Sequence, residues 1–196
     1  FGFMFLFMGV IYWSISIFGS EAQAGFGIGS RVMQAIFLPA MAIAFATAPV
    51  AGQNMGAGKF DRVRQTFTTA AVMLSCLMLL LTALCHIRPD LLISTFSSEP
   101  AVIAAGAGFL QIISYNFVAN GIVFTCSGMF QAMGNTMPSL LTSGSRILTF
   151  VLPAVWMARQ PWFEINQLWY VSVASISLQA VLAWLLVTRE MRIRLH

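Results

Sequence analysis

Charge is what this sequence has least of. Only 8% of its 196 residues are charged, whereas 59% are hydrophobic. An ordinary soluble domain carries about 25% charged residues, because its surface has to be covered with them. The scarcity of charge therefore excludes a soluble domain, and the apolar, aromatic-rich composition excludes a disordered chain. What remains is an integral membrane protein.

The apolar runs are continuous and lack the alternation of a transmembrane β-barrel strand. A bilayer-spanning helix needs roughly 20 apolar residues, and charged or turn-forming residues divide the chain into six such runs. We therefore predict an all-α membrane domain over residues 1–196, with six transmembrane helices at about 1–18, 24–51, 63–85, 101–131, 139–158 and 167–188. The first run begins with Phe1 and carries no charge, so we expect the chain to be cut at its N-terminus.

Small residues and proline predict local features of these spans. Gly25 and Gly29 form a G-x-x-x-G pair, which favours close helix packing. Gly121 and Gly128 offer places for the long fourth span to bend, and Ser98 is the predicted N-cap of that span. Prolines predict bends in the second and fifth spans, at Pro39, Pro49 and Pro153.

Basic residues gather in alternate loops. The loops after the second and fourth spans and the C-terminal tail together hold six, namely Lys59, Arg62, Arg64, Arg189, Arg192 and Arg194. The opposite side holds two, Arg88 and Arg159. The positive-inside rule then places both ends in the cytoplasm, in a bacterial inner membrane. Large aromatic residues are expected to form a belt at the outer side: Trp13, Trp156, Trp162, Trp169 and Tyr170.

Carboxylates are absent from the interiors of the six spans. All six acidic residues lie in loops or at span ends: Glu21, Asp61, Asp90, Glu99, Glu164 and Glu190. Carriers driven by protons or sodium usually keep an embedded carboxylate, because a charge in the bilayer is tolerated only where it has a function. The coupling group is therefore not visible in these spans.

Two arginines are embedded. Arg146 lies about eight residues into the fifth span, where it either snorkels to the cytoplasmic interface or lines a cavity and pairs with a helix C-terminus or an acid. Arg31 lies closer to the outer interface and is expected to snorkel or to pair with Glu21.

The fourth span carries a polar stripe. At about 100° per residue, four of its polar side chains fall within one narrow wedge: Asn116, Asn120, Ser127 and Gln131. Such a stripe faces protein or water rather than lipid. It serves either interhelical hydrogen bonding or a substrate or ion path. We take Asn116, Asn120 and Arg146 as the candidate pathway residues.

Motifs for catalysis or metal binding are missing. Cys76, Cys85 and Cys126 have no C-x-x-C spacing and are interpreted as packing residues. No H-x-x-x-H pair and no paired carboxylates occur, so we expect neither an enzyme nor a metal site or cofactor. The positive net charge is assigned to cytoplasmic loops rather than to nucleic-acid binding.

Three segments carry a resemblance to a known family. Residues 27–40 contain G-I-G-S-R-V-M-Q and L-P-A, and residues 48–58 read A-P-V-A-G-Q-N-M-G-A-G. Residues 128–138 read G-M-F-Q-A-M-G-N-T-M-P. In these motifs, and along essentially its whole length, the chain resembles the multidrug and toxic compound extrusion (MATE) family.

The resemblance implies a twelve-helix secondary transporter built from two six-helix lobes, of which this chain is the C-terminal one. Its partners would then be the missing N-terminal lobe, membrane lipid and small drug-like substrates. The family exchanges Na⁺ or H⁺ for cationic, often aromatic compounds by alternating access. Asn120 stands where some members carry an aspartate, so we hypothesise that the coupling carboxylate lies in the N-terminal lobe.

Two alternatives stay open beside a multidrug exporter. A lipid-linked oligosaccharide flippase of the same superfamily should use a strongly cationic cavity, whereas only Arg31 and Arg146 are embedded here. A non-transporting membrane assembly subunit would only pack against partners, which the polar stripe and the prolines disfavour mildly.

Overall fold

The computed structural model describes residues 2–195, and the side chains of residue 5 and residues 7–195. Every regular element in this part of the chain is helical. In chain order they are α1 (Gly2–Ile15), the 3₁₀ turn η1 (Ser16–Phe18), α2 (Ser20–Gly56), α3 (Phe60–Ile87), α4 (Pro89–Ser94), α5 (Pro100–Ile113), α6 (Asn116–Ala132), α7 (Met137–Arg146), the π-helix η2 (Ile147–Val151), α8 (Leu152–Met157) and α9 (Ile165–Arg194).

The predicted class, an all-helical membrane protein, is confirmed. Four helical segments are long and apolar enough to cross a bilayer: α2, α3, the run Met137–Met157 and α9. The pair α5 and α6 forms a fifth if it counts as one bent span, and the apolar helix Phe7–Phe18 is shorter. A helix therefore lies at each of the six predicted positions.

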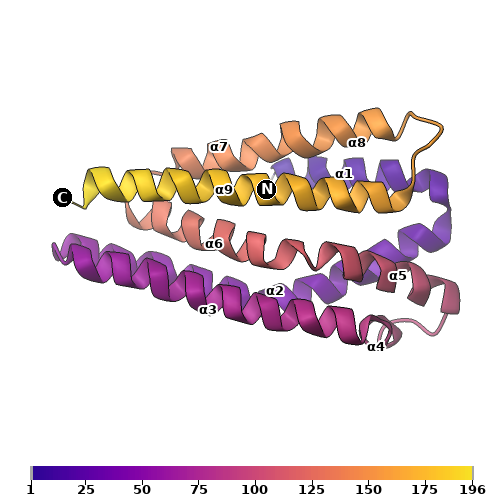
Figure 1. Cartoon of the computed structure of the whole chain (residues 1–196), viewed down its shortest axis with the longest axis horizontal. Coiled ribbons are helices and arrows are strands. Elements are labelled where there is room, and N and C mark those ends of the chain that lie inside the picture. The colour runs from indigo at the N-terminus through magenta and orange to yellow at the C-terminus, as the bar shows by residue number, and fades with distance from the viewer. Residues whose placement is uncertain (1, 196) are drawn as a thin grey trace.

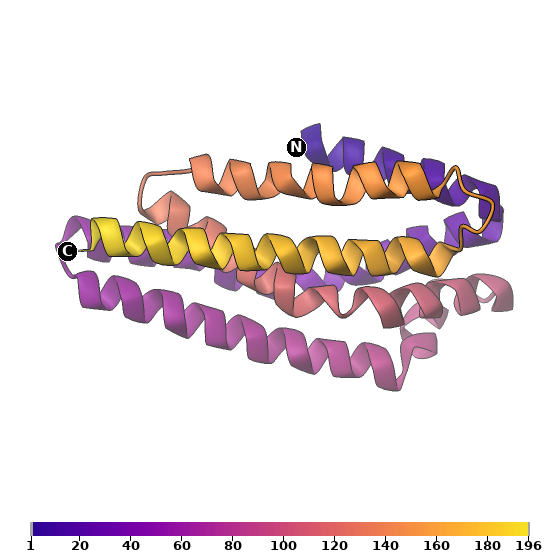
Figure 2. The same ribbon diagram turned by 45° about the horizontal axis from the view of Figure 1, so that its top comes forward.

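The helices lie lengthwise in one bundle (Figures 1 and 2). In Figure 1, α3 runs along the lower edge, α9 along the middle, and α7 and α8 along the upper edge. Helix α2 packs against α3, α5 and α6, and α9 packs against α5, α6 and α7. Two apolar clusters fill the space between them, one around Phe26, Phe109 and Phe117 and one around Phe67 and Phe130.

Glycine ends two of the helices at one end of the bundle. Gly58 follows α2 with φ of 68°, and Gly134 follows α6 with φ of 69°. Only glycine adopts this left-handed conformation without strain, so both turns fall where the sequence predicted them. The predicted Ser98 cap is wrong: α5 begins at Pro100 with Glu99 as N-cap residue, because proline at the first helical position sets the start.

The G-x-x-x-G pair packs as predicted. A Cβ atom on Gly25 would lie 2.7 Å from Cβ of Ala105 and 2.9 Å from the backbone nitrogen of Gly106. A Cβ on Gly29 would overlap the Phe109 ring. These two glycines therefore let α2 and α5 approach more closely than side chains would allow.

The fourth span does not bend at Gly121 or Gly128, so that prediction is wrong. The 55° bend lies between α5 and α6, at residues 114 and 115. There the hydroxyl of Thr82, on α3, donates to the carbonyl oxygen of Ser114 at 3.0 Å. A side chain that binds a backbone group in this way stabilises a break in the helical ladder. Gly121 and Gly128 instead pack closely against α3 and α2.

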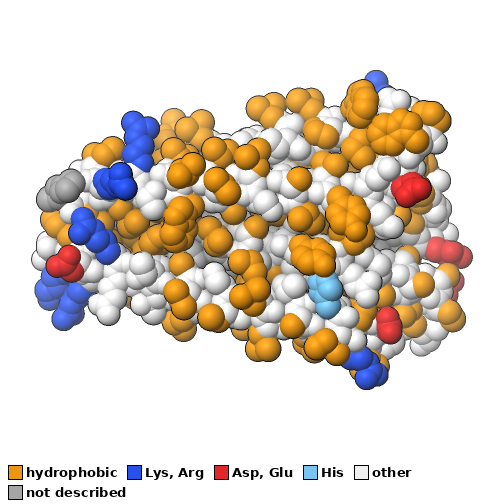
Figure 3. All heavy atoms as spheres, viewed as in Figure 1, with side chains coloured by type: hydrophobic (Ala, Val, Ile, Leu, Met, Phe, Trp, Pro, Cys, Tyr) orange, Lys and Arg blue, Asp and Glu red, His pale blue; other side chains and the backbone are white. Residues whose placement is uncertain are grey.

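Charges separate between the two ends of the bundle. Figure 3 shows Lys and Arg side chains gathered around the C-terminal end, and most of the visible acidic side chains at the opposite end. Hydrogen bonds tie the basic end together: Arg64 donates to the Leu195 carbonyl at 3.0 Å, and Arg194 to the Met133 carbonyl at 2.8 Å. The loops that the sequence assigned to one side therefore lie together in space.

The predicted aromatic belt is correct only in part. Trp13, Trp156, Trp162 and Tyr170 are exposed. Trp169 is only 3% exposed and stacks on Phe26 with ring centroids 5.6 Å apart. It belongs to the core because it sits on the face of α9 that packs against α5 and α2.

Candidate functional site

The polar stripe of α6 begins with the buried side chain of Asn116. This residue is 2% exposed, and its Nδ2 donates to the hydroxyl of Ser172 on α9 at 3.3 Å. Its Oδ1 is buried and has no hydrogen-bond partner. A buried amide oxygen without a partner costs about 1–3 kcal/mol, so the burial of the Asn116 side chain is unfavourable for stability.

The other stripe residues diverge from Asn116. Asn120 is half-buried and donates to the Asn116 carbonyl of its own helix at 3.0 Å. Ser127 lies 3.1 Å from the hydroxyl of Ser139 on α7. Gln131 is exposed. The stripe thus makes interhelical hydrogen bonds at Asn116 and Ser127. Its C-terminal half, with Ser127 and Gln131, lines part of a small cavity of about 60 Å³ between α2 and α6.

A π-helical turn adds a second set of polar groups. In η2 the hydroxyl of Thr149 lies 2.7 Å from that of Ser175 on α9. Pro153 follows η2 and cannot donate to the carbonyl of Thr149, and its ring would clash with that oxygen in a regular helix. The wider turn accommodates the proline. Such turns are frequent at functional sites.

Helix α9 supplies three buried polar side chains that our sequence analysis missed. Ser172, Ser175 and Gln179 are at most 5% exposed, and Oε1 of Gln179 has no partner. They lie at positions i, i+3 and i+7, so they share one helix face. The periodicity that revealed the stripe on the fourth span would have found them on the sixth.

Arg146 ends α7 and points toward α1. Its guanidinium lies over the ring of Phe7, 4.4 Å from the centroid, and its Nε is buried without a hydrogen-bond partner. Within residues 2–195 the ion pairs are Asp61 with Arg64 and Glu190 with Arg194. The cation is therefore held by an aromatic face, an arrangement that neither predicted alternative included.

The remaining candidate residues have simpler environments. Arg31 is exposed and forms no ion pair with Glu21, which leaves the snorkelling alternative. Cys85 and Cys126 are buried, as packing residues are, whereas Cys76 is exposed. Among the described residues, no three His, Cys, Asp or Glu side chains lie close enough to hold a metal ion.

Buried Asn116, Ser172, Ser175 and Gln179, together with Thr149, form what we call the α6–α9 polar cluster. Its members come from α6, η2 and α9, and all are neutral hydrogen-bonding groups. An apolar bundle with a polar interior of this kind is typical of membrane proteins that bind or conduct polar solutes. The fold and the cluster thus define a polytopic helical membrane protein with polar groups in its interior.

Comparisons with known proteins give the family. A family model described as MatE matches residues 1–157. The chain therefore belongs to the MatE family, and the resemblance found in its sequence is confirmed.

Curated relatives are longer than this chain. It is 28% identical over 155 residues to the "Probable multidrug resistance protein YpnP" of Bacillus subtilis, and the aligned region covers 79% of this chain and 33% of that protein. It is 28% identical over 145 residues to the "Probable multidrug resistance protein NorM" of Thermotoga maritima, covering 74% and 30%. An "FAD transporter" of Shewanella oneidensis is 26% identical over 133 residues, covering 68% and 29%.

Solved structures share the fold. An outward-facing MATE family transporter superposes with a TM-score of 0.90 at 18% identity, covering 98% of this chain and 44% of that one. The Vibrio cholerae MATE transporter VcmN in its bent form gives 0.83 at 23% identity, covering 92% and 41%. The chain thus spans less than half the length of these transporters and about a third of the length of the curated relatives.

Proposed function

We propose that this chain is the C-terminal lobe of a secondary multidrug efflux transporter that exchanges Na⁺ or H⁺ for small, often cationic and aromatic compounds by alternating access. Membership of the MatE family over residues 1–157 carries the proposal, since two of the relatives above are named as multidrug resistance proteins. The coverage of 44% of a MATE structure supports a second lobe of similar size as its partner.

Asn116, Asn120 and Arg146 remain our candidates for the substrate or ion pathway. The half-buried Asn120 is the best residue to test, because its side chain bonds only its own helix and its loss should leave the packing between helices intact. We expect Asn120→Leu, in the whole natural protein, to reduce ethidium export from an efflux-deficient bacterium several-fold without lowering membrane abundance. Unchanged export would mean that the stripe is structural.

Gln111→Leu provides the matched control. Gln111 is exposed on α5, off the stripe, so the same change of an amide to an apolar group should leave export intact. Proteoliposomes with an imposed Na⁺ or H⁺ gradient would then identify the coupling ion. Absence of dye movement under both gradients would favour the assembly-subunit alternative.

A second substrate class has a specific observation behind it. One relative is named as an FAD transporter, and the Arg146 guanidinium forms no ion pair with any carboxylate in the described part of this chain. An unneutralised cation favours an anionic aromatic substrate such as a flavin nucleotide. Uptake of ethidium and of FAD by the same proteoliposomes would distinguish the two substrate classes. The names of these relatives do not favour the alternative of a lipid-linked oligosaccharide flippase.

We propose a bacterial inner-membrane location with the basic end in the cytoplasm, on the basis of the bacterial relatives and the separation of charge. Ala57→Cys at the basic end and Gln160→Cys at the opposite end test the orientation. A membrane-impermeant maleimide should label intact cells only at position 160. Labelling at position 57 would reverse the proposed orientation.

A further inference from the structure

A groove runs between α2 and α3 toward the basic end of the bundle. The two helices are antiparallel and joined by the short turn around Gly58, and the groove between them has a volume of about 550 Å³. It lies apart from the α6–α9 polar cluster, because its lining comes from α2 and α3 alone.

The polarity of the groove changes along its length. Near the turn its lining includes Asn54 of α2 and Arg62 and Gln65 of α3. Further from the turn it is lined by the apolar Ile43 of α2 and Met73 of α3. Eleven residues separate Asn54 from Ile43 and Arg62 from Met73, which corresponds to ~16 Å of helix or about half of a ~30 Å bilayer core. The gradient therefore covers one leaflet.

Arg62 is the charged group that lines the groove, and no carboxylate within residues 2–195 forms an ion pair with it. The neighbouring Asp61 pairs instead with Arg64 at 3.9 Å. The hydroxyl of Thr66 donates to the Arg62 carbonyl, and Nδ2 of Asn54 to the Val50 carbonyl, so these groups are engaged within their own helices. The Arg62 guanidinium and the Gln65 amide are left as donors for a ligand.

We propose that this groove binds one anionic phospholipid of the leaflet at the basic end. The phosphate contacts Arg62 and Gln65, and an acyl chain lies along the apolar walls formed by Ile43, Ala46 and Met73. Arginine suits this position because its planar guanidinium binds two phosphate oxygens at once. The groove is charged near the headgroup region and apolar toward the centre of the bilayer, as a phospholipid is. This match favours a lipid over a further protein segment, which would need no such change in polarity. This lipid site is separate from the proposed transport function, and it does not depend on which substrate is carried.

Photolabelling tests the proposal on the whole natural protein. It is placed in nanodiscs of phosphatidylcholine with 5% of a phosphatidylglycerol that carries a diazirine on its acyl chain, and adducts are mapped by mass spectrometry. We expect adducts on residues 43–50 and 66–73. Arg62→Gln should lower their yield about fivefold, since one basic side chain near an anionic headgroup contributes about 1 kcal/mol. Arg62→Lys should keep most of it.

Blocking the apolar part gives an independent arm. Ala46 is an exposed residue of the groove wall, so Ala46→Trp should fill the space and lower the yield to a similar extent. The matched controls are Ala42→Trp, an exposed alanine one turn away that does not line the groove, and Arg192→Gln, an exposed arginine at the same end of the bundle. Both should label like the wild type.

Three results would overturn the proposal. Equal loss in Arg192→Gln would indicate general attraction to the basic end. Equal labelling by a phosphatidylcholine diazirine probe would show that the headgroup charge is irrelevant. Absence of adducts on α2 and α3, with the probe labelling other helices, would mean that another part of the whole protein covers the groove.

Discussion

Gly25 shows how a single missing side chain determines helix contact. The place of its Cβ is already occupied by Ala105 and by the backbone of Gly106, and backbone cannot rotate away as a long side chain does. We expect Gly25→Ala to destabilise the folded state by about 1–3 kcal/mol, the usual cost of overpacking. Thermal unfolding in detergent, followed by fluorescence-detected size exclusion, would measure the loss.

Gly108 on α5 is the control for this substitution. It is also helical, but a Cβ there meets nothing within 4 Å. Gly108→Ala should therefore be neutral or slightly stabilising, since alanine is the better helix former by about 1 kcal/mol. Equal destabilisation by the two variants would contradict the close-packing account.

At the candidate site, sequence alone predicted which residues are polar and inward-facing, but not what they contact. The stripe placed Asn116 on a protein-facing surface, and the structure buries it there. Its partner Ser172 lies 56 residues away in the chain, and Phe7 lies even further from Arg146. Periodicity reports on one helix at a time, so pairings between helices of such separation come only from the tertiary structure.

At the scale of elements, the break between α5 and α6 depends on α3. Ser114 is fully buried, and its carbonyl accepts a hydrogen bond from the Thr82 hydroxyl. Thr82→Val keeps the shape of the side chain and removes the donor. We expect a loss of about 0.5–1.5 kcal/mol, the usual value of one hydrogen bond, because the backbone N–H of Phe117 still donates to the Ser114 carbonyl. The melting temperature of the purified whole protein would report it.

Thr68→Val on the same helix is the matched comparison. The Thr68 hydroxyl is exposed and bonds only carbonyls of α3 itself, those of Arg64 and Gln65. Its replacement should change stability by less than about 0.5 kcal/mol, as for most surface sites. If Thr82→Val were equally harmless, the bend would not need this contact.

The break also shows where sequence-based prediction of elements failed. Span positions followed from hydropathy and the turns from Gly58 and Gly134, and both agree with the structure. Glycine predicted the wrong bend, because Gly121 and Gly128 are used for contact between helices. The residues at the true bend, Ser114 and Tyr115, carry no strong helix-breaking signal, and the group that stabilises it comes from another helix.

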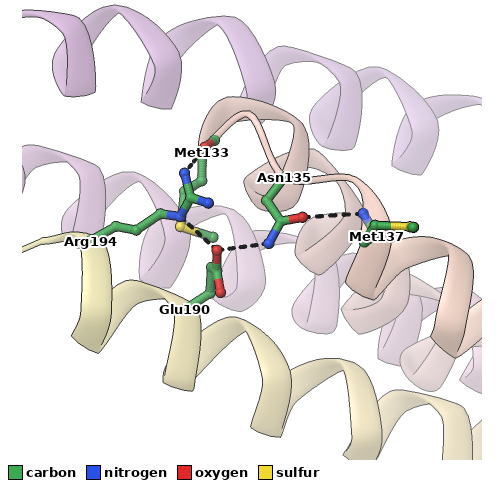
Figure 4. A network of polar contacts seen from close by, with 5 residues as sticks. All are labelled: Met133, Asn135, Met137, Glu190 and Arg194. Atoms are coloured by element: carbon green, nitrogen blue, oxygen red, sulfur yellow. Dashed lines mark hydrogen bonds and ion pairs between the residues drawn. The ribbon is translucent and has the colours of Figure 1, made fainter.

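A polar network joins α9 to the turn between α6 and α7 (Figure 4). Glu190 accepts hydrogen bonds from Nδ2 of Asn135 at 2.8 Å and from Nε of Arg194 at 2.6 Å. Glu190 lies beyond the apolar part of α9. The hydrogen bond from Asn135, and to a smaller extent the interaction with Arg194, lower the pKa of Glu190 below the ordinary glutamate value. The carboxylate therefore holds the two elements together most strongly while it is ionised.

The sign of the pH effect follows from that lowered pKa. The contribution of Glu190 is fully present above the ordinary glutamate pKa of about 4.3, and it is lost as the pH falls through the lowered value. At pH 7 we expect Glu190→Gln to speed amide hydrogen exchange in residues 133–137 several-fold. Asp61→Asn, which alters a fully exposed carboxylate at the same end, should leave exchange there unchanged.

Across the whole molecule, the carboxylates lie at the ends of the bundle. Glu21, Asp61, Asp90, Glu99 and Glu164 are exposed, and Glu190 belongs to the network at the basic end. The α6–α9 polar cluster, in contrast, holds amides and hydroxyls. Under our proposal that the chain belongs to an ion-coupled carrier, a group that binds the coupling ion is needed within the membrane, and this arrangement favours a carboxylate in the proposed N-terminal lobe.

Neutralising these carboxylates one at a time tests where coupling resides. In the whole protein, reconstituted and driven by a Na⁺ or H⁺ gradient, Glu21→Gln, Asp61→Asn, Asp90→Asn, Glu99→Gln and Glu164→Gln should each retain gradient-driven dye transport within about twofold of the wild type. The physical reason is that exposed carboxylates at the ends of helices are solvated and screened, so they exchange no ion with an interior path. Replacement of membrane-embedded carboxylates in the remainder of the protein should abolish the response to the gradient while dye binding persists. Loss of coupling in any one of the five variants would instead place an ion-binding group at the end of this lobe.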